Sequence, residues 1–200
     1  MALVTILFGG GFTLLACYSL GRVFLWRIRA PQVMALPVGA AILSLCVYSL
    51  LLLGLADRGA FLALGVAALL SLLWRDRRPT VQQAREPLDP VTRWLLIGVF
   101  TAYGVFYAVH ALAPEIQPDA LYYHLGLVSE YFRIGTFPER IDFYDILPQG
   151  MEMLYLFAFA FGRHSAAKLV HFAFLIATVP VMFCAGISTV PLMAIFFAFA

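Results

Sequence analysis

The sequence predicts an all-α, polytopic integral membrane protein, and three observations support this fold class. First, 63% of the 200 residues are hydrophobic and only 12% are charged. Second, the apolar residues form runs of about 20 residues, the length that a helix needs to cross a hydrocarbon core roughly 30 Å thick. Third, seven of the eleven acidic residues lie in one polar stretch, from Ala113 to Glu152. We therefore expect a membrane scaffold that carries one polar loop.

The apolar runs predict six membrane-spanning helices, at about residues 3–25, 34–56, 60–74, 94–112, 148–162 and 166–187. The third run is short, because at 1.5 Å per residue it reaches only about 24 Å. The segment Asp57-Arg58-Gly59 before it predicts a tight turn between antiparallel helices. A last apolar run, from Pro191 to Ala200, either lies in the membrane interface or continues into a longer protein. We favour the longer protein, which gives six or seven spans in this stretch.

The basic residues predict the orientation of these spans, since cytoplasmic loops are enriched in Lys and Arg. Clusters follow the first, third and fifth spans: Arg22, Arg27 and Arg29, then Arg75, Arg77, Arg78, Arg85 and Arg93, and finally Arg163 and Lys168. With six spans, all three clusters fall on one face, which we assign to the cytoplasm. The N-terminus and the polar loop 113–147 are then expected outside, in the periplasm or at the cell exterior.

Several other classes of protein are disfavoured by the composition. The net charge is +2, and no basic patch is interleaved with aromatic residues, so the sequence does not predict nucleic-acid binding. Cys17, Cys46 and Cys184 lie in apolar runs without paired spacing, which is typical of small buried hydrophobic residues rather than of disulfides or metal ligands. A divalent metal is a candidate cofactor that the spacing of the acidic and histidine residues does not support.

The polar loop contains the pattern of a short amphipathic helix at 120–134. Pro118 and Asp119 suit its beginning, and Gly135 followed by Pro138 suits its end. On a helical wheel one narrow stripe is apolar and consists of Leu121, Leu125, Val128 and Phe132. Such a helix is of the kind that lies flat at a membrane surface, so we expect a juxtamembrane helix here.

Asp119 is the candidate catalytic residue, and it has two interpretations. As the N-cap, its carboxylate would accept hydrogen bonds from the first amides of the helix, a role that needs no function. As a carboxylate at the outer surface, it could accept a proton from an acceptor hydroxyl or amine while a lipid-linked donor is cleaved. The two roles are compatible.

Four further residues of the loop region are candidate substrate contacts: Glu115, Tyr123, His124 and Glu152. Glu152 lies about one turn into a predicted span, so it either lines a cavity or reaches back to the interface. His124 is either a packing residue or a ligand near Asp119. Solvated loop charges are expected at three positions: Glu115, Asp142 and Asp145. An interfacial aromatic belt is expected, with sugar stacking as the alternative, at Tyr122, Tyr123, Tyr131, Phe132, Phe143 and Tyr144.

At this loop the sequence resembles the GT-C superfamily of polytopic membrane glycosyltransferases, which includes protein O-mannosyltransferases and bacterial aminoarabinose transferases. The resemblance covers residues 94–162. It is carried by PEIQPDALYYHL in the loop and by LPQGMEMLYLFAF at the start of the next helix.

This resemblance implies transfer of a sugar from a polyprenyl-phosphate carrier on the non-cytoplasmic face, by a protein of the bacterial inner membrane. It maps the family's loop carboxylate onto Asp119, although Ala120 stands where many members carry a second acidic residue. It also implies that 94–200 begins the GT-C core, with the catalytic loop at 113–147. Residues 1–93 then form a three-helix extension, and the chain is the N-terminal part of a truncated GT-C fold.

Two other functions remain open from the sequence. A transporter or flippase of a lipid-linked substrate would use the loop as a gate, but such proteins tend to place ionisable residues near the bilayer midplane. Only His171 lies well inside a predicted span, where we expect a hydrogen-bonded structural role. A non-catalytic membrane scaffold, in which Asp119 only caps a helix, is the third alternative.

Overall fold

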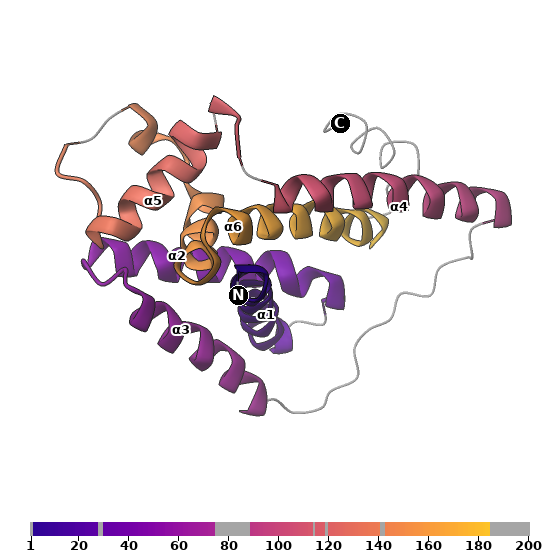
Figure 1. Cartoon of the computed structure of the whole chain (residues 1–200). Coiled ribbons are helices and arrows are strands. Elements are labelled where there is room, and N and C mark those ends of the chain that lie inside the picture. The colour runs from indigo at the N-terminus through magenta and orange to yellow at the C-terminus, as the bar shows by residue number, and fades with distance from the viewer. Residues whose placement is uncertain are drawn as a thin grey trace.

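The computed structural model describes residues 2–27, 30–74, 89–113, 115–118, 120–140 and 143–184, and these residues form helices without any strand. The α-helices are α1 (Ala2–Phe24), α2 (Ala35–Leu52), α3 (Arg58–Leu70), α4 (Pro90–Leu112), α5 (Leu125–Ile134) and α6 (Gly150–Cys184) (Figure 1). Short 3₁₀ turns lie at Leu25–Arg27, Gln32–Met34, Ser71–Trp74 and Phe143–Ile146, and a π-helical turn, η4, lies at Ala120–His124. The predicted all-α class is confirmed.

Four helices of the described part are long and apolar enough to cross a membrane, and they contain the candidate spans Leu3–Phe24, Gln32–Leu52, Pro90–Leu112 and Gly150–Met182. The third predicted span corresponds to the shorter apolar helix Arg58–Leu73. It begins at Asp57, an N-cap that the sequence analysis did not identify, since Oδ1 of Asp57 accepts hydrogen bonds from the amides of Gly59 and Ala60. The basic segment 75–88, Asp119, Asp142 and the last apolar run lie outside the described residues.

Helices α1 and α2 pack backbone against backbone. A Cβ atom added to Gly39 would lie 1.6 Å from the carbonyl oxygen of Cys17, and one added to Gly21 would lie 1.7 Å from that of Ala35. Cys17 and Gly21 are four residues apart on α1, as are Ala35 and Gly39 on α2. Small residues at this spacing allow apolar helices to approach closely, which maximises van der Waals contact. Helices α3 and α6 pack on this pair, and α4 and α5 pack on α6.

Helix α6 contains a bend where the sequence predicts a loop between two spans. Arg163 has φ 60° and ψ −156°, and helical backbone continues on both sides of it. Figure 1 shows the first half of α6 nearly end-on and the second half lying across the view beside α4. The first half, residues 150–162, is about 20 Å long at 1.5 Å per residue, which is shorter than a hydrocarbon core. Its residues 153–160 are buried in the protein core.

One contact bears on the predicted orientation, which stays a prediction. The charge pattern places Lys168 on the cytoplasmic face and the polar loop outside, but Nζ of Lys168 lies 3.2 Å from Oε2 of Glu115 in that loop. The two residues therefore lie on the same side of the molecule. The bend at Arg163 lies between the first turn of α6, which contacts the loop at His124, and Lys168, which contacts it at Glu115.

The predicted helix at 120–134 is present, as η4 followed by α5, and it ends at Gly135 in the left-handed conformation with φ 75°. Its buried residues are Leu125, Leu127, Val128 and Tyr131, which belong to the same core cluster as the first half of α6. The apolar face of α5 thus packs against protein. A location at the membrane surface stays a prediction.

Candidate functional site

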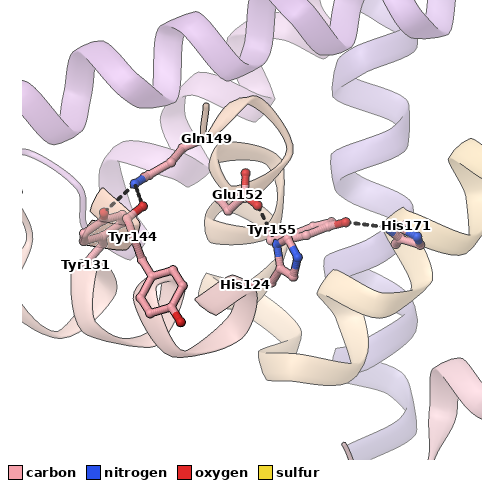
Figure 2. Close-up of polar contacts among 7 residues, drawn as sticks. All are labelled: His124, Tyr131, Tyr144, Gln149, Glu152, Tyr155 and His171. Carbon is pink, nitrogen blue, oxygen red and sulfur yellow. Dashed lines mark hydrogen bonds and ion pairs between the residues drawn. The ribbon is translucent and has the colours of Figure 1, made fainter. Parts of the chain in front are cut away.

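The centre of the candidate site is a contact between the polar loop and the first turn of α6. Nδ1 of His124, the last residue of η4, lies 2.6 Å from Oε1 of Glu152 (Figure 2). The Glu152 side chain is 4% exposed, whereas the His124 side chain is 39% exposed. Two residues that the sequence analysis assigns as substrate contacts are therefore joined, and Glu152 does not reach back to the interface.

The surroundings of Glu152 explain why it needs this partner. Met153, Leu154 and Leu156, which follow it, are at most 2% exposed. A carboxylate buried among apolar groups is strongly unfavourable unless a cation or hydrogen-bond donor compensates it. The imidazole of His124 supplies that donor, so the contact fixes the loop onto α6.

A second polar pair lies one turn further along α6. The Tyr155 hydroxyl is hydrogen-bonded to Nδ1 of His171, and Figure 2 shows this pair beside the His124–Glu152 contact. Tyr155 belongs to the first half of α6 and His171 to the second, so the bend at Arg163 brings them together. The hydrogen-bonded role expected for His171 is confirmed, but its partner Tyr155 was not identified from the sequence.

Glu115 and Lys168 form the third polar contact. Oε1 of Glu115 accepts the amides of Ile116 at 3.0 Å and Gln117 at 2.9 Å, and Nζ of Lys168 also donates to the carbonyl oxygen of Ala113 at 2.9 Å. Burial alone would raise the pKa of Glu115, but the Gln117 amide and the Lys168 ammonium together hold it below its ordinary value. The expectation of a solvated Glu115 is wrong, because its side chain is 14% exposed and paired.

Tyr123 extends the site towards the end of the loop. Its ring contacts that of His124, with centroids 4.2 Å apart, and stacks on Tyr144 at 5.3 Å. Tyr144 lies in the 3₁₀ turn Phe143–Ile146, which precedes α6. The stack therefore connects the two ends of the polar loop. Aromatic faces beside a carboxylate–imidazole pair can hold the apolar face of a sugar ring or an isoprenoid chain.

A hydrogen-bond network fastens the same segment to α5. The Tyr131 hydroxyl donates to Oδ1 of Asp145 at 2.7 Å. Nε2 of Gln149 donates to the Tyr131 hydroxyl at 2.9 Å, as Figure 2 shows. Burial, with the Asp145 hydrogen bond, raises the pKa of Tyr131 above its ordinary value. The sequence analysis missed this network: it placed Tyr131 in an interfacial belt and Asp145 in solvent. Asp145 lies 14 residues and Gln149 lies 18 residues from Tyr131 in the sequence, and no local pattern links positions so far apart.

The site therefore brings together three of the five predicted residues. Tyr123, His124 and Glu152 meet where the loop contacts the first turn of α6. Glu115 instead contacts Lys168 on the second half of α6, and Asp119 lies outside the described residues. In the part of the chain that the structure describes, no group of three or more His, Cys, Asp or Glu side chains could hold a metal ion. An imidazole held by a carboxylate at Nδ1 has a fixed tautomer.

Lys168 and His171 lie one turn apart on the second half of α6. Through them the Glu115 contact and the Tyr155 contact share one helix face, since residues three apart are neighbours on a helix. No family model, curated protein or solved structure matches this chain.

Proposed function

We propose that this chain is part of a membrane glycosyltransferase of the GT-C type, which transfers a sugar from a polyprenyl-phosphate carrier to an acceptor on the non-cytoplasmic face. The observation that carries the proposal is the His124–Glu152 contact, a nearly buried carboxylate joined to a half-exposed imidazole in an otherwise apolar chain. Carrier-linked sugars require this combination of proton-exchanging groups and apolar surface. The resemblance of residues 94–162 to the superfamily supports the same function.

The proposed reaction is a single displacement. Asp119 deprotonates or orients the acceptor, the acceptor attacks the anomeric carbon, and the polyprenyl phosphate leaves. Tyr123 and Tyr144 offer aromatic surface beside His124, and a sugar ring can stack there. The finer architecture, with six or seven spans and a core that begins near residue 94, belongs to the same proposal.

The test uses the full-length protein in proteoliposomes that contain a polyprenyl-phosphate-linked sugar and a mixture of acceptors. Asp119→Asn keeps an oxygen that can cap a helix but removes the basic carboxylate, and we expect transfer to fall by about 10²-fold or more. Asp57→Asn is the matched control, because Asp57 is an exposed N-cap of α3 away from the site. Transfer at the wild-type rate by Asp119→Asn would show that this residue neither deprotonates nor orients the acceptor.

A transporter or flippase of a lipid-linked substrate is the second candidate, and the interruption of α6 at Arg163 favours it. Transporters build their sites on broken helices with ionisable groups nearby, as Glu152 and His171 are here. The same proteoliposomes separate the alternatives. A glycosyltransferase forms product, a flippase moves the labelled carrier between leaflets without product, and a scaffold does neither.

A further inference from the structure

We propose that His124 is the group that takes the proton from the acceptor, and that Glu152 is a positioning residue that holds the imidazole for this step. The inference rests on the proposed function and assigns a mechanism within it. It leaves Asp119 with the orienting role, which is one of the two roles that the proposed reaction allows.

The first argument is the geometry of the pair. Oε1 of Glu152 lies 2.6 Å from Nδ1 of His124, within the range of a charge-assisted hydrogen bond. A carboxylate can only accept here, so Nδ1 carries the proton that is shared with it. In the neutral imidazole the lone pair is then on Nε2, the nitrogen on the opposite edge of the ring. The tautomer that can act as a base is therefore the one that the carboxylate selects.

The second argument is the difference in exposure between the two partners. The Glu152 side chain is 4% exposed and the His124 side chain is 39% exposed, so the pair extends from the protein core to its surface. A buried carboxylate cannot itself meet an acceptor from solution, whereas a half-exposed imidazole can. This division, with one member fixed in the core and the other accessible, is typical of positioned general bases.

The third argument is the stabilisation of the product of proton transfer. When Nε2 takes a proton, the imidazolium lies against the carboxylate in a site of low polarity, where the attraction between opposite charges is strong. Among the described residues, the Tyr123 ring lies against His124 on the loop side, and Tyr155 and His171 lie on the α6 side. Glu152 is the anion that the structure places against Nδ1, where it compensates the imidazolium.

The step balances as follows. The O–H or N–H bond of the acceptor breaks, and its proton goes to Nε2 of His124. The electron pair left on the acceptor atom forms the bond to the anomeric carbon. The bond from that carbon to the carrier phosphate breaks, and its electron pair leaves with the phosphate oxygen. The phosphate is a stable anion and needs no proton, so the imidazolium releases its proton to water after the product leaves.

The experiment measures kcat and KM of transfer by the full-length protein in proteoliposomes. His124→Gln keeps an N–H donor for Glu152 but has no basic nitrogen, and we expect kcat to fall by about 10²-fold with KM within a few-fold of wild type. His124→Ala is expected to regain activity when imidazole is added to the buffer. Glu152→Gln is expected to reduce kcat by about 10-fold, as is usual for the loss of a partner that orients a catalytic histidine.

The controls separate chemistry from folding and separate this inference from the proposed function. Two exposed residues serve as controls: His110→Ala on α4 and Glu130→Gln on α5 should leave kcat unchanged. A monodisperse elution profile in detergent reports that each variant folds. If wild type transfers sugar but His124→Gln keeps its kcat, or if the loss is confined to KM, the inference is wrong and the proposed function stands. If wild-type protein transfers no sugar, both are wrong.

Discussion

Replacing Lys168 with Met tests the contact between the second half of α6 and the polar loop. Met keeps the apolar length of the side chain but removes the ammonium, which lies 3.2 Å from Oε2 of Glu115 and 2.9 Å from the carbonyl oxygen of Ala113. The substitution therefore leaves a carboxylate without its cation and a helix-terminal carbonyl without its donor.

The expected loss follows from these two contacts. At an effective dielectric constant of about 20, two unit charges at this distance attract by about 5 kcal/mol, and desolvation opposes much of that attraction. Removing one member of a fully buried pair costs roughly 3–5 kcal/mol. Glu115 keeps two backbone N–H donors and some exposure, so we assign about 2 kcal/mol to the charge. The hydrogen bond to Ala113 adds about 1 kcal/mol, which gives about 3 kcal/mol in total.

The assay is urea unfolding of the protein in detergent micelles, arranged as a double-mutant cycle. Glu115→Gln in the Lys168→Met background should recover about 2 kcal/mol, because it removes the stranded charge. Arg133→Met is the control, since its pair with Glu130 is 3.9 Å long and exposed, and it should lose less than about 0.5 kcal/mol. Equal losses from Lys168→Met and Arg133→Met, or no recovery in the double variant, would refute the contact.

Three further predictions concern stability. Gly39→Ala should lower the free energy of unfolding by at least about 2 kcal/mol, because its Cβ would overlap the Cys17 carbonyl. Gly104→Ala, whose Cβ would meet nothing within 4 Å, should raise it by about 0.5–1 kcal/mol. Thermal unfolding in detergent compares the two variants. Arg163→Gly should be more stable than Arg163→Ala by about 1–2 kcal/mol in the same assay, since φ 60° with ψ −156° suits only glycine. The lowered pKa of Glu115 contributes stability above about pH 4.5 that is lost as pH falls through its folded pKa, so Glu115→Gln should flatten the dependence of urea midpoint on pH in this range.

The sequence predicts features that depend on local composition. Runs of apolar residues identify α1, α2 and α4 because helix length and hydropathy are set by neighbouring residues. The end of α5 is predicted for the same reason, since Gly135 can adopt the left-handed conformation there at no steric cost. Each of these signals lies within a few residues of the feature that it predicts.

The contacts of the site are not local, and this is why the sequence analysis missed most of them. His124 and Glu152 are 28 residues apart, and no periodicity links them. The orientation rule counts basic residues without knowing which of them are paired, so Lys168 was counted as a cytoplasmic charge although Glu115 neutralises it. Gly162-Arg163 suggests a loop, because nothing in the sequence shows that an arginine takes a positive φ inside a helix.

The close packing of α1 on α2 also orders events during biosynthesis. Both helices lie within the first 52 residues, so the pair can form as soon as the translocon has released them. Helix α6 instead completes contacts over much longer stretches of chain: Ser44 meets Gly150 across 106 residues, and Arg58 meets Ala160 across 102. A chain that stops before Gly150 therefore keeps the residues that join α1 to α2 but lacks Glu152, the carboxylate that holds His124 in the folded protein.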